Sequence, residues 1–340
     1  MSEDKFAIRK LEGDADLKLW DGFVAASPQA NPFSTSGWLL NAGAAVGAEI
    51  EIWIASKGDR IVAGIPIPTR RMGERWHLGL PLSAYDTFVY RSRAAGHPAA
   101  ATSEHLEVTE ALLAATQKGI KNWSLLLSTA IDDVRPWIWA GWAARPRYTY
   151  VLDVSEPLQV AATVRPRLRK AQEAGMAMRE EWDLDAIWSV FAGTQGRQGF
   201  GVRLTREQFD RLARSLYEGG LARMEIAFAP DGEPAAGHIV LAVPGTQTAF
   251  QWIAGTNGRY LQSGVSAWQT VASAAELGRR GFRSWDLCGA DLPSVARFKS
   301  DLGAALVAYY QVDAPRGAVE SLYGALKSSW RALRRSGGPA

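Results

Sequence analysis

The chain has 340 residues, of which 47% are hydrophobic and 21% are charged, and it carries a formal net charge of +3. This amount of apolar material fits one large core or two ordinary ones, and two domains are the expectation for such a length. The single cysteine excludes an internal disulfide, and the four histidines lack metal-ligand spacing, so we expect no metal site. The charged first residues and the lack of an apolar run of ~18 residues favour a cytoplasmic protein without a membrane span.

In chain order, the first half predicts two helices, a hairpin, a longer helix and two strands. The hairpin is the clearest element, because apolar and polar side chains alternate over residues 49–71 around the turn signal Lys57-Gly58-Asp59. The other elements are expected within residues 17–27, 31–47 and 103–119 for the helices and within 123–129 and 148–154 for the strands.

The second half predicts a similar order of elements. Two turn signals, Asp231-Gly232 and Pro244-Gly245, divide residues 224–255 into a three-stranded antiparallel meander. A strand around Trp285 and a short helix behind Pro293 follow it. Helices are expected within residues 156–175, 183–199, 205–220 and 263–281.

The two halves form a registered repeat at an offset of 162 residues. The offset pairs Gly119 with Gly281, Lys121 with Arg283, Trp123 with Trp285, Leu125 with Leu287, Gly141 with Gly303, and Tyr148 with Tyr310. It also places Trp137 opposite Lys299 and Pro136 opposite Phe298. If both halves share one fold, that fold does not require a lysine at this position, and Lys299 becomes a candidate for chemistry.

The segment "FRSWDLCGADLPSVARFKSDLGAALVAYY" contains a strand, a carboxylate, a loop and a Phe-Lys helix in that order. In this order it resembles the Fem family, whose members contain two GNAT acyltransferase domains in tandem. "NPFSTSGWL", "IVAGIPIPTRR" and "RLRKAQEAGMAMRE" are similar to family segments in the first half and at the start of the second. The resemblance implies an α/β (α+β) fold of two tandem GNAT-like domains, each a mixed, largely antiparallel sheet flanked by helices.

The expected domains are residues 1–154 and 155–315, followed by a basic helix or tail at 316–340. The resemblance implies transfer of an aminoacyl group from aminoacyl-tRNA to an amine on a cell-wall precursor, a polysaccharide or a natural product. An acyl-CoA-dependent N-acyltransferase is the alternative, and a non-catalytic double-GNAT binding scaffold is a third. The protein is expected to be a monomer or homodimer without a tightly bound cofactor.

The donor site departs from the usual GNAT pattern. The glycine-rich loop that holds the CoA pyrophosphate at a helix start is missing from "NGRYLQSGVSAW". Ser263 and Gly264 at the start of that helix remain candidates for contact with an anionic group of the donor through backbone amides. Arg165 and Arg169 share a helix face and form a second candidate phosphate site, with a solvated basic face as the structural alternative.

Lys299 and Asp286 are the expected catalytic residues. Lys299 lies at the border of an apolar stripe, where a lysine can simply cover apolar surface. The resemblance instead implies that it lies in the active cleft and stabilises an oxyanion or binds a donor phosphate. Asp286 lies within a strand, where a carboxylate needs a partner, so a structural ion pair and acid-base chemistry both remain open.

The remaining candidates are expected to contact substrate. Asp86 and its neighbour Tyr85 lie in an aromatic loop that resembles the acceptor side of the Fem family, with a plain loop aspartate as the alternative. Trp252 and Gln251 lie on opposite faces of one strand, so one belongs to the core and the other lines the cleft. Phe298 precedes the candidate lysine directly.

Overall fold

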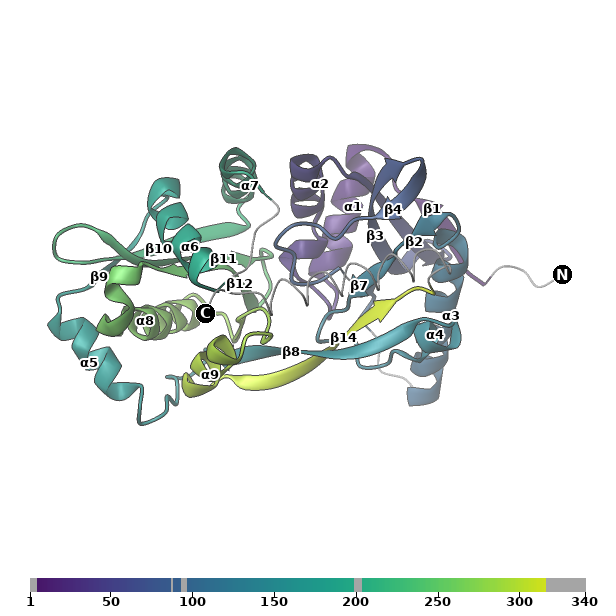
Figure 1. The fold of residues 1–340 in the computed structure, drawn as a ribbon. Helices are drawn as coiled ribbons and strands as arrows, with labels where there is room; N and C mark the ends of the chain where they lie inside the picture. The colour runs from purple at the N-terminus through teal and green to yellow at the C-terminus, as the bar shows by residue number, and fades with distance from the viewer. Residues whose placement is uncertain (1–4, 87, 93–96, 199–203, 316–340) are drawn as a thin grey trace, which may run out of the picture.

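A computed structural model of the chain describes residues 5–86, 88–92, 97–198 and 204–315. Its elements form two sheets with helices on their faces, and a long ribbon of two strands runs from one half of the molecule to the other (Figure 1). The basic segment expected at 316–340 lies outside the described residues.

The helices and strands follow the predicted order closely. The first half contains β1 (Ala7–Lys10), α1 (Gly13–Ala25), η1 (Pro32–Ser34), α2 (Ser36–Val46), β2 (Glu49–Lys57), β3 (Arg60–Met72), β4 (Glu74–His77), β5 (Val89–Tyr90), α3 (Pro98–Thr116), β6 (Ile120–Lys121), β7 (Ser124–Leu126), α4 (Arg135–Trp139) and β8 (Ala143–Asp153). The second half contains α5 (Arg165–Glu173), β9 (Ala177–Glu180), α6 (Leu184–Gln198), α7 (Arg206–Glu218), β10 (Ala222–Phe228), β11 (Pro234–Ala242), β12 (Thr248–Thr256), η2 (Gly258–Ser263), α8 (Val265–Arg279), β13 (Ser284–Asp286), α9 (Pro293–Asp301) and β14 (Ala305–Asp313).

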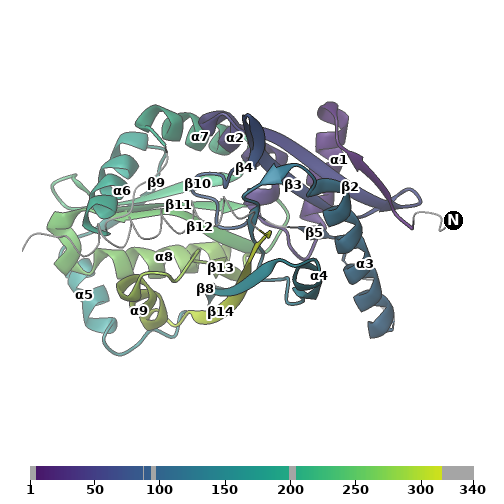
Figure 2. The same cartoon turned by 45° about the vertical axis from the view of Figure 1, so that its right-hand side comes forward.

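Both sheets are mixed and largely antiparallel, as expected. The first has the order β1-β2-β3-β4-β6, with β5 paired to β3, and the second has the order β7-β14-β8-β13-β12-β11-β10-β9. Within the described strands, each sheet contains one parallel pair, β4 with β6 in the first and β12 with β13 in the second. Helices α6 and α7 lie on one side of the second sheet and α5 and α8 on the other (Figures 1 and 2).

The two halves share an aromatic core. Trp38 of α2 packs edge-on against Trp252 of β12, with ring centroids 5.6 Å apart, and Phe33 packs in the same way against Phe250. All four rings are at most 8% exposed. Burial of such large apolar side chains is worth about 2 kcal/mol or more for each, so this contact holds the halves firmly together.

The ribbon of β8 and β14 relates the two halves by a pseudo-twofold axis. The strands pair antiparallel over nine positions, from Ala305 with Val151 to Asp313 with Ala143. The 162-residue offset of the repeat relates Arg147 to Tyr309, and these two residues are register partners at the centre of the ribbon. The repeat in the sequence therefore corresponds to a repeat in the structure, and the axis passes between Arg147 and Tyr309.

Each half contributes a strand that pairs with a strand of the other half. The end of β14 pairs with β7 of the first half, and the end of β8 pairs with β13 of the second. The second sheet therefore contains strands from both sides of the predicted boundary between residues 154 and 155.

Local conformation repeats as well. Gly141 and Gly303, which follow α4 and α9, have φ angles of 82° and 87°, a region that glycine enters without strain. Trp137 of α4 is fully buried at the position that Lys299 has in α9. One fold thus accommodates a core tryptophan in one copy and a lysine in the other.

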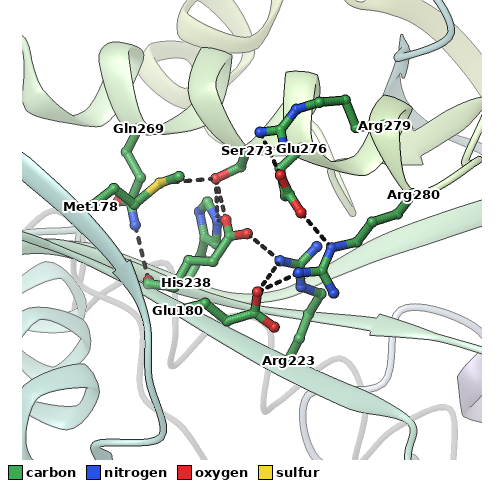
Figure 3. Close-up of polar contacts among 10 residues, drawn as sticks. Met178, Glu180, Arg223, His238, Gln269, Ser273, Glu276, Arg279 and Arg280 are labelled. Carbon is green, nitrogen blue, oxygen red and sulfur yellow. Dashed lines mark hydrogen bonds and ion pairs between the residues drawn. The ribbon is translucent and has the colours of Figure 1, made fainter.

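A buried polar network fixes α8 on the second sheet (Figure 3). The carboxylate of Glu225 on β10 accepts a hydrogen bond from the Ser273 hydroxyl of α8 and lies 2.8 Å from Nε2 of His238 on β11. Arg223 forms an ion pair with the same carboxylate at 2.7 Å. Burial alone would raise the pKa of Glu225, but the hydrogen bonds and charge of these partners lower it to about 2.

The variant Glu225→Gln tests this network. We expect it to lower the free energy of unfolding at pH 7 by about 3 kcal/mol, because His238 and Ser273 lose a buried carboxylate and Arg223 keeps only Glu180 as an ion-pair partner. Since the carboxylate has a depressed pKa, its contribution is present above pH 4.5 and is lost as the pH falls toward 2. Denaturant unfolding of wild type and variant should therefore converge over that window.

The matched control is Glu104→Gln, which breaks the exposed ion pair with Lys57 at 3.6 Å. We expect a change of at most about 1 kcal/mol. Equal losses in the two variants would contradict the anchoring role of the network.

Candidate functional site

The parallel strands β12 and β13 part at Asp286. Their register runs from Thr248 with Ser284 to Phe250 with Asp286, where β13 ends, while β12 continues to Thr256. The pairing of β12 with β11 shifts its register between Gln251 and Ile253, directly after Phe250. Such a shift increases the local twist of the strand. Beyond Phe250, the side of β12 that faced β13 is without a strand partner in the described part of the chain.

A tight turn follows β13 at this point. Cys288 has a φ of 52° and Gly289 a φ of 85°, so two consecutive residues adopt left-handed conformations. Such a conformation is unfavourable for a residue with a side chain and persists only when its surroundings impose it. The turn is therefore held by contacts to its backbone.

Lys299 holds the carbonyl groups of the turn. Its Nζ donates hydrogen bonds to the carbonyl oxygens of Leu287 at 2.6 Å, Cys288 at 3.1 Å and Gly289 at 2.7 Å. The side chain is 7% exposed, and burial lowers the pKa of the ammonium group, opposed by the neighbouring acidic groups. An ammonium group has three hydrogens, and all three are used on this turn.

Asp286 and Thr149 hold the amide groups of the same turn. One oxygen of Asp286 accepts the Cys288 N–H at 2.8 Å and the hydroxyl of Thr149 at 2.6 Å. The Thr149 hydroxyl in turn accepts the Gly289 N–H at 3.0 Å. The turn is thus fixed by Lys299 on its carbonyl side and by these two side chains on its amide side.

Tyr85 connects this site to the first half of the chain. Its hydroxyl donates to the second oxygen of Asp286 at 2.5 Å, and both side chains are 2% exposed. Burial, together with the Asp286 charge, raises the pKa of Tyr85 well above its usual value, so the phenol keeps its proton and serves as donor. Burial also raises the pKa of Asp286, while its hydrogen-bond donors and Lys299 oppose that rise.

The site extends to the surface through the centre of the ribbon. Tyr309 packs edge-on against Tyr85, with ring centroids 5.4 Å apart, and the neighbouring Arg147 pairs with Asp291 at 2.5 Å. The Asp291 side chain is 61% exposed. The polar groups thus run from a buried carboxylate on β13 to a solvent-exposed ion pair beside the turn.

Asp86 is a half-buried carboxylate on the adjacent loop. Its backbone N–H donates to the carbonyl of Leu126 at 2.8 Å, which fixes the loop against β7. Burial raises the pKa of Asp86 to about 7, opposed by a hydrogen bond from Ser83. A carboxyl group with this pKa exchanges protons at neutral pH and can act as a general base.

The other three predicted substrate contacts, Gln251, Phe298 and Trp252, lie in different environments. Gln251 is half-buried where the strands part, and its backbone contacts the Cys288 thiol. Phe298, on α9, is half-buried and packs against the hydrophobic core of the second half. Trp252 belongs to the shared aromatic core and is 8% exposed, so its expected contact with substrate is corrected to a packing role.

The two predicted phosphate sites are not brought to the turn. Arg165 and Arg169 are exposed on α5. Gly264 lies against α5 so closely that an added Cβ would be 2.1 Å from the carbonyl oxygen of Arg167, and the Ser263 hydroxyl accepts the Val265 N–H of its own helix. The Val265 amide at the start of α8 is therefore already bonded within the chain, and contact of Ser263 and Gly264 with a donor stays a prediction.

Sequence reasoning missed three groups, namely Thr149 and the buried pair of His238 and Ser273. Thr149 gives no signal beyond a polar residue inside a strand. Serine, histidine and a carboxylate resemble a catalytic triad, but Ser273 and Glu225 both contact Nε2 of His238, at 2.9 and 2.8 Å. A triad needs the two ring nitrogens on separate partners, so this set stabilises the fold.

Cys288 is unsuited to covalent catalysis in this setting. Burial and the nearby Asp286 charge raise the pKa of its thiol well above the usual value, so the reactive thiolate is disfavoured. Among the described residues, no group of three histidine, cysteine or acidic side chains is arranged to hold a metal ion. None of the described helices is long and apolar enough to cross a membrane.

The variant Tyr85→Phe tests the link between the halves. We expect it to lower the free energy of unfolding by about 2 kcal/mol, because the buried Asp286 carboxylate loses a charged hydrogen bond. Tyr148→Phe, at a tyrosine that is 45% exposed, is the control and should change stability by at most about 0.5 kcal/mol. Denaturant unfolding measures both, and equal values would show that the Tyr85 hydroxyl contributes nothing to the contact.

Comparison with known proteins gives a family match for part of the chain. Residues 159–300 match the family model described as the acetyltransferase (GNAT) domain. This segment contains the whole meander, α8, the turn and Lys299. No curated protein sequence matches the chain.

Solved structures extend the likeness over nearly the whole chain. The crystal structure of FemX aligns with a TM-score of 0.65 at 10% identity, covering 89% of this chain and 96% of that one. The C-terminal domain of a putative lysylphosphatidylglycerol synthetase from Agrobacterium fabrum aligns at 0.57 and 12% identity, covering 93% and 95%. A tandem GNAT protein from the clavulanic acid biosynthesis pathway aligns at 0.51 and 13% identity, covering 92% and 99%. The chain therefore has the Fem-like fold of two GNAT-like units, and the GNAT domain match lies in its second half.

Proposed function

We propose that the protein is an acyltransferase that moves an aminoacyl group from aminoacyl-tRNA to an amine acceptor. The observation that carries this proposal is the parting of β12 and β13 at a turn whose backbone is fixed on both sides. The cleft of GNAT domains lies where two strands splay apart, and the match of residues 159–300 to such a domain supports the same use of this point here. Rigid backbone groups at this point can orient an activated ester against an incoming amine.

The start of α8 favours aminoacyl-tRNA over acyl-CoA as the donor. A CoA pyrophosphate requires free amides at this helix terminus, but Gly264 packs against α5 and the Val265 N–H is already bonded to the Ser263 hydroxyl. The exposed arginines of α5, Arg165 and Arg169, offer instead a basic face for a tRNA backbone. The FemX likeness is consistent with this choice, and acyl-CoA remains the alternative donor.

Asp86 is the proposed general base on the acceptor side. A protonated amine is not a nucleophile, so an acceptor ammonium must lose a proton before it attacks the ester. The raised pKa of Asp86, about 7, suits that transfer near neutral pH. Tyr85 fixes the same loop to Asp286 and so determines where Asp86 lies relative to the turn.

Lys299 contributes by positioning in this proposal. Its three hydrogens are used on the carbonyls of the turn, so direct contact with an oxyanion or a donor phosphate would require one of those bonds to break. The ammonium charge still lies beneath the point where β12 and β13 separate, where it favours negative charge that develops during acyl transfer.

A donor and acceptor panel tests the reaction. Purified protein is incubated with amines and either charged tRNA or acyl-CoAs, and formation of the amide is followed by mass spectrometry. We expect product with charged tRNA and a loss of about 100-fold or more in Lys299→Met, since the turn loses its carbonyl partner. Lys118→Met, at an exposed lysine after α3, should retain the wild-type rate.

Two outcomes would redirect the proposal. Activity that survives RNase and releases CoA would replace tRNA with acyl-CoA as the donor. If wild type consumes neither donor, the acyltransferase proposal fails, and the protein is better described as a non-catalytic double-GNAT binding scaffold.

The pH dependence tests Asp86. Because the base must be ionised, the rate should fall as the pH drops below about 7, to roughly a tenth of the plateau at pH 6. Asp86→Asn should lower the rate by about 100-fold or more and remove this dependence. Asp59→Asn, in the exposed hairpin turn, is the control. A wild-type pH profile in Asp86→Asn would assign the titration to another group.

A further inference from the structure

We propose that Thr149, on β8 of the first half, is a positioning residue for the site in the second half. Its hydroxyl holds the Cys288–Gly289 turn in its left-handed conformation, so the site is completed by a side chain from outside its own repeat. The inference rests on the proposed function for its effect on rate, but its effect on the turn is independent of any activity.

The geometry of one hydroxyl carries this inference. Thr149 donates to Asp286 at 2.6 Å and accepts the Gly289 N–H at 3.0 Å, so it is both donor and acceptor within one buried link. The residue has no exposed surface, and water therefore has no access to replace it. Without the hydroxyl, the amide of the half-buried Gly289 would lose its partner and the buried Asp286 would lose a donor.

The two sides of the turn depend on different halves of the chain. Lys299 comes from α9 and binds the carbonyls, whereas Thr149 comes from β8 and binds an amide. Cys288 lies between them at a φ of 52°, which relaxes readily once either side is released. The turn keeps its shape only while both sets of contacts are present.

The repeat provides an internal comparison. The 162-residue offset relates Thr149 to Gln311 and Asp286 to Ser124, and the Gln311 side chain donates to the Ser124 hydroxyl at 3.0 Å. The contact between ribbon and strand therefore occurs in both halves. Trp137 takes the place of Lys299 in the first half. Of the two contacts, only the one between Thr149 and Asp286 therefore lies beside a turn that a lysine binds.

Cys288 gives a direct readout of the turn. It is the only cysteine in the sequence, so the rate at which a thiol reagent labels the native protein reports on this one position. Thr149→Val removes the hydroxyl with little change in volume. We expect it to label about tenfold faster than wild type, because loss of one buried hydrogen bond shifts the opening of the turn by about that factor.

Three comparisons make the test specific. Thr149→Ser keeps a hydroxyl and should return the labelling rate toward wild type, which also serves if the valine variant folds poorly. Ser124→Ala removes the symmetry-related contact and should leave labelling unchanged. In the transfer assay, Thr149→Val should lower kcat by about tenfold, in step with the opening of the turn, with little change in the KM of the acceptor.

Each result decides the inference. If Thr149→Val labels at the wild-type rate, or if Ser124→Ala also labels faster than wild type, the inference that Thr149 fixes the turn is wrong. Faster labelling with an unchanged kcat would overturn its role in the reaction. If wild type transfers no acyl group, the proposed function fails, and the labelling rates alone decide whether Thr149 fixes the turn.

Discussion

The antiparallel pairing of β8 with β14 is the constraint on which the rest of the structure depends. The ribbon places Tyr309 against Tyr85, and β8 continues beside β13 to bring Thr149 to Asp286. The candidate site is therefore built at the pseudo-twofold axis from both halves, although the matched GNAT segment lies in one of them. A shift of one residue in the register of β8 against β13 would turn Thr149 to the opposite face and remove it from the site.

The sequence predicted the parts of this structure that depend on local patterns. Alternation around Lys57-Gly58-Asp59 predicts β2 and β3, and the constant offset between Trp123 and Trp285 predicts two similar halves. Exchange of strands between the halves was not predictable, because a strand looks the same in sequence whichever sheet receives it. Thr149 was missed for the same reason, since its partner lies 137 residues away.

Lys299 shows what a pattern and a structure each contribute. Comparison of the repeats singled it out, since Trp137 fills the same place in the first half. Its three carbonyl partners, however, depend on the left-handed turn at Cys288, which no periodicity reveals. The lysine thus remains the most informative residue of the site, with its proposed duty changed from direct contact to positioning.

The exchange of strands also determines how the chain acquires its structure during synthesis. The first half emerges from the ribosome with β7 and the length of β8 unpaired, since their partner β14 ends only at Asp313. An exposed strand edge of this kind is open to pairing with other chains until its own partner arrives. Completion of the first half therefore waits until β14 has been made.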